Sequence, residues 1–141
     1  MIQELMIINQ AGLALFYHNF INDEMIDDEQ SLASYFDVIC RFTKQSFKES
    51  LKILELDSFI FFFYTQKSNY HLVLKCENKL FDKQLLESIS EKIIEEFLNK
   101  YKEILQDFNG EISYFKPFSN QIVKIIRNQF RGFKDIPYVE F

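Results

Sequence analysis

Four side chains in this sequence are of the types that most often bind metals or act as nucleophiles: His18, His71, Cys40 and Cys76. Both histidines fall in predicted strands, and neither has a cysteine or carboxylate beside it at metal-ligand spacing. Cys40 lies among apolar residues of a predicted helix, which favours a buried thiol over a nucleophile. We therefore expect no metal site, no cofactor, no catalytic residues and no enzymatic activity. A Ser-His-Asp triad assembled from distant residues stays open, although the sequence has no nucleophile-elbow signature.

The segment around Gly12 raises the question of a phosphate-binding loop, because a glycine after an apolar strand can open one. The sequence holds only three glycines, so neither a GxGxxG motif nor a GxxxxGK[ST] motif can be written. A second apolar strand follows Gly12, where a phosphate loop would lead into a helix. We therefore predict a hairpin turn at this glycine.

The run from Asp23 to Glu29 holds five carboxylates in seven residues and raises the question of a calcium site. It lacks the alternation, the glycine and the closing glutamate of an EF-hand loop. We predict a solvated acidic loop that ends in a helix start, with Asp27 and Gln30 spaced as in a capping box.

The composition is that of one globular domain. The chain has 141 residues, of which 48% are hydrophobic, and 17 Phe and 7 Tyr supply enough bulk for a core. A net charge of −5 argues against general nucleic-acid binding. No apolar run reaches the roughly 18 residues of a membrane span, no basic residue precedes the first apolar run, and the cysteines lack CxxC spacing. We expect a cytoplasmic protein, at most peripheral to membranes.

The basic residues near the C-terminus, Lys124, Arg127, Arg131 and Lys134, alternate with phenylalanines. They permit two interpretations, and the sequence leaves both open. The first is contact with an anionic surface, either membrane headgroups or an acidic partner. The second is a helix C-terminus whose cations complement the helix dipole, followed by a tail that packs its aromatic rings on the domain.

Hydrophobic periodicity predicts the order ββ-α-βββ-α-α. The predicted strands are Ile2–Asn9, Leu13–Phe20, Leu51–Leu56, Phe59–Thr65 and Tyr70–Cys76. The predicted helices run from about Asp27 to Phe47, over Asp82–Phe108, and over Ser119–Asn128 with Ser119 as N-cap. The strands must share one sheet because neither group is large enough alone, and helices must cover both faces because the strands are apolar on both.

This order, with a strand hairpin directly at the N-terminus, resembles the longin domain. Longins typically carry the pattern (I/V)-x-N-x-x-G between their first two strands, and Asn9 and Gly12 match it. The resemblance covers about residues 1–128 and leaves residues 129–141 as an aromatic and basic tail. It implies an α+β fold: a five-stranded, mostly antiparallel sheet of order 2-1-5-4-3, with one helix on one face and two on the other. A roadblock domain fits less well because it begins with a helix.

Longin domains are non-enzymatic interaction modules of membrane-trafficking machinery that bind small GTPases, often as dimers. The resemblance therefore implies an adaptor or GTPase-regulating subunit in vesicle transport, or its archaeal counterpart. The implied partner is a small GTPase, another longin or roadblock protein, or a second copy of the chain. The alternative is a small-ligand sensor of the PAS or profilin kind, which needs a pocket with convergent polar groups. The many phenylalanines weigh against such a pocket.

Physical reasoning also places an interaction surface at the third strand. Charged residues interrupt Leu51–Leu56, which suggests a sheet edge whose unpaired backbone groups can pair with another chain. We predict that this edge and the end of the first helix bind the partner. The candidate residues are Arg41, Gln45, Lys48, Leu51, Lys52, Ile53 and Glu55.

Overall fold

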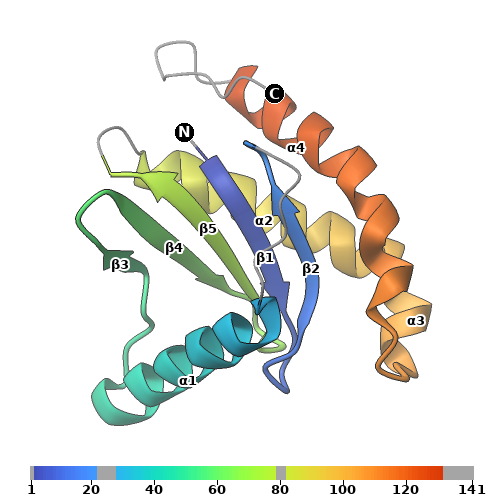
Figure 1. The fold of residues 1–141 in the computed structure, drawn as a ribbon, viewed down its shortest axis with the longest axis horizontal. Coiled ribbons are helices and arrows are strands. Elements are labelled where there is room, and N and C mark those ends of the chain that lie inside the picture. The colour runs from blue at the N-terminus through green and yellow to red at the C-terminus, as the bar shows by residue number, and fades with distance from the viewer. Residues whose placement is uncertain (1, 22–27, 79–81, 132–141) are drawn as a thin grey trace.

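The computed structural model describes residues 2–21, 28–78 and 82–131. The strands are β1 (Ile2–Ile8), β2 (Ala14–Asn19), β3 (Ile53–Glu55), β4 (Phe59–Thr65) and β5 (His71–Glu77). The helices are α1 (Glu29–Phe47), α2 (Lys83–Lys100), α3 (Lys102–Gln106), the 3₁₀ helix η1 (Ile112–Phe118) and α4 (Ser119–Arg131). One five-stranded sheet has the order β2-β1-β5-β4-β3, and all its strand pairs are antiparallel. Helix α1 covers one face, and α2 and α4 cover the other (Figure 1). The predicted fold class and strand order are confirmed.

The central strands are buried on both faces, so alternate residues enter two separate cores. On the side of α2 and α4, Leu5 and Ile7 join a large aromatic core around Phe97. The ring of Phe97 lies 5.3 Å from that of Phe115 and 5.1 Å from that of Phe118. On the other side, a smaller core packs β1, β2, β4 and β5 against α1; its buried members are Met6, Ile8, Ala14, Ala33, Phe36, Cys40, Phe63 and Val73.

The turn between β1 and β2 is organised by Asn9. Its side-chain Oδ1 accepts hydrogen bonds from the backbone N–H groups of Ala11 at 3.0 Å and Leu13 at 2.9 Å. Gly12 has a φ of +81°, in the left-handed region that favours glycine. A Cβ atom at Gly12 would lie 3.1 Å from Oδ2 of Asp37 in α1. The hairpin prediction is confirmed, and both matched residues of the longin-like pattern serve the turn.

Strand β3 is an edge strand, as predicted, but it is shorter than the predicted Leu51–Leu56. Backbone hydrogen bonds continue just outside it: the Phe63 N–H donates to the Lys52 carbonyl at 2.8 Å, and the Leu56 N–H donates to the Phe59 carbonyl at 2.9 Å. The segment from Lys52 to Leu56 therefore runs alongside β4, although only its central residues form a regular strand ladder.

The start of α1 differs from the predicted capping box. The N-cap is Asp28, whose side chain accepts from the Ser31 N–H at 3.1 Å, and Asp27 lies outside the described residues. Gln30 instead binds the backbone of Ala14: its Oε1 accepts from the N–H at 2.9 Å and its Nε2 donates to the carbonyl at 3.0 Å. Gln30 therefore fastens α1 to the edge strand β2. Most of the predicted acidic loop, residues 22–27, lies outside the described residues.

The predicted single helix Asp82–Phe108 is wrong, because the helix breaks at Tyr101. Asp82 is the N-cap of α2, and Tyr101 leaves helical geometry with φ −108° and ψ 19°. The Tyr101 ring is buried between Phe97, at 5.1 Å, and Phe115, at 5.0 Å. Because the Tyr101 ring still packs in the core, the hydrophobic spacing of the sequence continues across the break. The periodicity therefore does not reveal that the helix ends at Tyr101.

The expected N-cap at Ser119 is also wrong. The 3₁₀ helix η1, which contains Pro117, runs directly into α4, and Ser119 has helical angles of φ −53° and ψ −32°. Helix α4 continues beyond Asn128 to Arg131. Residues 132–141 of the predicted tail lie outside the described residues.

Candidate functional site

The outer side of α1 carries an exposed apolar stripe formed by Tyr35, Val38 and Phe42. Their exposed fractions are 51%, 61% and 62%. The spacing of three and four residues puts them on one side of the helix, away from the buried residues that face the sheet. A surface helix normally presents polar residues there, so the stripe is a candidate interaction surface. We call these three residues the α1 stripe.

Further exposed apolar residues lie close to the α1 stripe in the chain. Phe47, the last residue of α1, is 67% exposed, and Leu56, directly after β3, is 42% exposed. Leu51 and Leu54 of the connection and of β3 pack against the same core as α1. The end of α1 and the β3 edge therefore belong to one side of the molecule.

The predicted partner-binding residues divide into two groups. Lys52, Ile53 and Glu55 lie at the β3 edge, and Lys52 and Glu55 are exposed. Lys48 follows α1 in a left-handed conformation with φ 59°, and its Nζ donates to the Gln45 carbonyl at 3.0 Å. The remaining three, Arg41, Gln45 and Leu51, line a cavity instead.

This cavity of about 440 Å³ lies beside the C-terminal half of α1. Its walls come from α1, from the Ser50–Leu51 connection, from the facing ends of β4 and β5, and from the β1–β2 turn through Gln10. The phenylalanines fill the two cores, as expected, but they do not fill this space. Sequence reasoning placed Arg41 and Gln45 on an outer surface and did not foresee the cavity.

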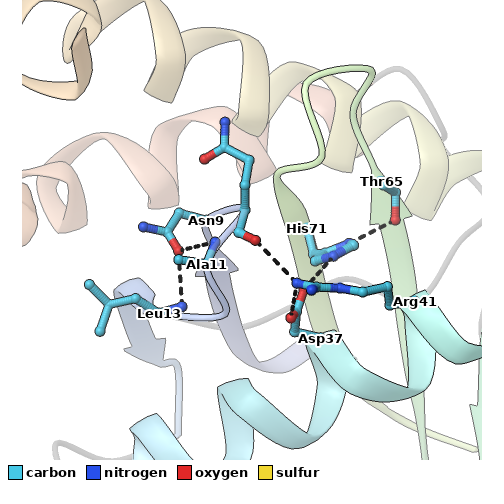
Figure 2. Close-up of polar contacts among 8 residues, drawn as sticks. Asn9, Ala11, Leu13, Asp37, Arg41, Thr65 and His71 are labelled. Carbon is cyan, nitrogen blue, oxygen red and sulfur yellow. Dashed lines mark hydrogen bonds and ion pairs between the residues drawn. The ribbon is translucent and has the colours of Figure 1, made fainter.

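A polar network at the cavity wall joins α1 to β5 and to the first turn (Figure 2). The buried Asp37 carboxylate contacts His71 Nε2 through Oδ1 at 3.2 Å and Arg41 Nη2 through Oδ2 at 2.5 Å. The same Nη2 donates to the Gln10 carbonyl at 3.2 Å. His71 Nδ1 lies 2.9 Å from Thr65 Oγ1.

The electrostatics of this network favour a neutral His71. Burial lowers the pKa of His71, and the Arg41 cation lowers it further, although the Asp37 carboxylate acts in the opposite direction. In the neutral ring, Nε2–H donates to Asp37, so Nδ1 accepts from the Thr65 hydroxyl.

The order hydroxyl, imidazole, carboxylate resembles a catalytic triad, but the charges do not favour that role. A triad carboxylate stabilises the imidazolium, whereas here Asp37 shares its charge with Arg41 and burial opposes protonation of His71. We interpret the network as a structural link.

Sequence reasoning missed Asp37 and took His71 for a satisfied or solvent-facing strand residue. One signal was available: Asp37 follows Ala33 by four residues and precedes Cys40 by three, so it lies on the buried side of α1. A carboxylate on that side requires a buried partner. The partner itself, 34 residues away, was not deducible from spacing.

The two histidines lie on opposite faces of the sheet. His71 contacts α1 through Asp37, whereas His18 stacks on Phe16, at 6.3 Å, within the face covered by α2 and α4. The two rings therefore cannot share one ion. Among residues 2–21, 28–78 and 82–131, no group of three or more potential ligands gathers at a metal-binding distance. Burial raises the pKa of the thiols of both Cys40 and Cys76 to about 12, so neither has thiolate character at neutral pH.

The basic residues near the C-terminus are only partly described. Lys124 and Arg127 are exposed on α4, and Arg131 is its last residue. Lys134 lies outside the described residues. Contact of these residues with an anionic surface stays a prediction. Within the described part of the chain, no helix combines the length and the apolar character needed to cross a membrane.

The strand order and the helices on both faces are those of the longin/roadblock fold. A chain from the structure of the mammalian SRP receptor has this fold: the similarity covers 94% of this chain and 97% of that one, with a TM-score of 0.62 and 14% identity. A Roadblock/LC7 domain from Streptomyces avermitilis matches over 71% of this chain and 84% of its own, with a TM-score of 0.56 and 16% identity. No family model and no curated protein matches the sequence. Identities this low establish the fold alone.

Proposed function

We propose that this protein is a non-enzymatic interaction module that acts as an adaptor or a small-GTPase-regulating subunit in membrane trafficking. The longin/roadblock fold is typical of protein-interaction modules. The observation that carries the proposal is the α1 stripe, because three large apolar side chains lie exposed on one side of a helix. A monomer without a partner gains nothing from this arrangement.

The partner surface that we propose combines the α1 stripe with the β3 edge. The stripe supplies apolar area: full burial of an exposed apolar side chain contributes about 1.5–3 kcal/mol, and these three, which are a little over half exposed, would each gain about half of that. The edge supplies unpaired backbone groups that can extend the sheet into a second chain. Lys48 directly follows α1, and Lys52 and Glu55 lie at the β3 edge, so their charges would help to select the partner.

The partner class follows from the resemblance to longin domains. We infer a small GTPase or another protein of the longin or roadblock kind, with a second copy of this chain as the simplest member of the latter group. The chain would regulate nucleotide turnover through that partner, since it contains no glycine-rich phosphate loop of its own.

Site-specific crosslinking tests the proposal. A photoreactive phenylalanine analogue replaces Val38 in the α1 stripe, and in a control protein it replaces Lys92, which is exposed on α2 on the opposite side of the sheet. After irradiation in lysate of the native cells, we expect position 38 alone to capture a small GTPase or a longin or roadblock protein. Equal capture at both positions, or capture of neither class at position 38, would refute the proposed surface.

A further inference from the structure

We propose that the cavity beside α1 is a binding site for a small molecule that joins an anionic group, phosphate or carboxylate, to an apolar portion. The proposal concerns the inner side of α1 and does not depend on the partner surface on its outer side. It rests on the charges that line the cavity, on their fixed positions and on the size of the space.

The charge of the cavity favours an anion. Two cations, Arg41 and Lys44, line it against one carboxylate, Asp37. The Asp37 carboxylate is already engaged, since Oδ1 contacts His71 and Oδ2 contacts Arg41. With His71 neutral, the cavity has a local excess of one positive charge in a chain whose net charge is −5. This local reversal of sign attracts an anionic group.

The polar groups around the two cations are mostly able to donate hydrogen bonds. Gln45, Asn69 and Ser50, whose side chains carry an amide or a hydroxyl, are among the residues that line the same space, as is Gln10. The Thr65 hydroxyl also lies there but already donates to His71. Phosphate and carboxylate oxygens accept several such bonds at once, which strengthens binding by charge-assisted hydrogen bonding.

The cavity wall is held in place before any ligand arrives. Arg41 is fixed by Asp37 and by the Gln10 carbonyl, and Asp37 is fixed in turn by His71 (Figure 2). Burying such a network usually costs more free energy than an apolar replacement would. A guanidinium that is already held in position loses less entropy when a ligand binds. A role in ligand binding would therefore explain why the chain keeps this polar network.

The cavity is larger than an inorganic anion alone would fill. Its volume of about 440 Å³ falls within the range of small-molecule pockets, roughly 300–1,000 Å³. Cys40 and Leu51 provide apolar surface in the wall. A ligand with both an anionic head and an apolar or ring-shaped portion matches these walls.

Three related probes test the proposal by NMR titration of the full chain: phenyl phosphate, benzoate and benzyl alcohol. The two anions carry the same ring as the uncharged alcohol, and they separate phosphate from carboxylate recognition. We expect at least one anion to shift the backbone amide signals of Gln45, Ser50 and Asn69. Benzyl alcohol should bind at least about tenfold more weakly, because it lacks the charge.

Two substitutions link the signal to the cavity. Lys44→Gln removes the cation that is not engaged with Asp37 and should weaken anion binding about tenfold, while Lys48→Gln, one turn further along and outside the cavity, should leave it unchanged. Asn69→Gly removes the amide but keeps the fold, because Asn69 has a φ of 68° that glycine adopts freely; it should also weaken binding. The proposal is overturned if neither anion shifts these signals at up to about 10 mM, or if Lys44→Gln and Lys48→Gln bind the anion equally well.

Discussion

Replacing Asp37 by alanine should destabilise the fold, because this carboxylate links α1 to β5 within the buried network. The substitution leaves the His71 Nε2–H without its acceptor, and both side chains are only 9% exposed. A buried donor left unpaired costs about 1–3 kcal/mol, and we take about 2 kcal/mol. The Arg41 side chain is 55% exposed, so loss of its ion pair adds only about 0.5 kcal/mol.

The expected loss of about 2.5 kcal/mol corresponds to a fall in Tm of about 7 °C for a domain of this size. Urea unfolding monitored by circular dichroism measures the free energy directly. Asp37→Asn is the matched control, because its amide oxygen can still accept from His71; it should lose about half as much. A loss below about 0.5 kcal/mol for Asp37→Ala would show that the network does not hold α1 to the sheet, and the interpretation of the site would fail.

The same network predicts a pH dependence. Burial lowers the pKa of His71 in the folded chain below its ordinary value of 6.5, so between these two values the unfolded state binds more protons. Stability from this residue is therefore full above about pH 6.5 and falls as the pH drops toward the folded-state pKa. Removing Asp37 takes away a charge that raises this pKa, so an NMR titration of His71 in Asp37→Ala should give a still lower value. An unchanged or higher pKa would contradict the proposed contact.

Two further predictions concern backbone conformation and thiol reactivity. Gly12→Ala should cost about 1–2 kcal/mol in urea unfolding, because φ is +81° and the new Cβ would lie 3.1 Å from Asp37 Oδ2. Gly110→Ala, with φ +91° and no atom within 4 Å of its Cβ, should cost less, and an equal cost would refute the contact with Asp37. A thiol pKa of about 12 for both Cys40 and Cys76 predicts slow alkylation by iodoacetamide at pH 8 in the folded chain and rapid alkylation in urea; fast labelling of folded Cys76, which lies in the core, would contradict its burial.

The sheet was predictable because its signal is local. Phe59–Thr65 is apolar at every position but its last, so it had to lie inside a sheet covered on both faces, and β4 has these bounds. In the following strand, the alternation of side chains between the two faces correctly placed Leu72, Leu74 and Cys76 on one face and Val73 on the other. The hairpin was predictable because a second apolar strand follows Gly12, and in the structure both Asn9 and Gly12 act within the turn.

The candidate site was less predictable because its contacts are distant in the sequence. Asp37 and His71 meet only when α1 lies across β5, and no spacing rule joins them. The α1 stripe was not foreseen for another reason: Tyr35 and Phe42 fit the three- and four-residue hydrophobic spacing of the predicted helix, and that spacing does not show that both are more than half exposed. The spacing of apolar residues in one sequence does not separate helix positions that face the core from those that stay exposed.

The affinity for the crosslinked partner tests the central claim most directly. Isothermal titration calorimetry compares the wild-type chain with Phe42→Asp, with the double charge reversal Lys48→Glu and Lys52→Glu, and with Lys92→Glu as a control on α2. We predict at least about tenfold weaker binding for the first two variants and unchanged binding for the control, with all proteins equally folded. Wild-type affinity in both Phe42→Asp and the double variant would contradict the claim that the α1 stripe and the β3 edge bind the partner.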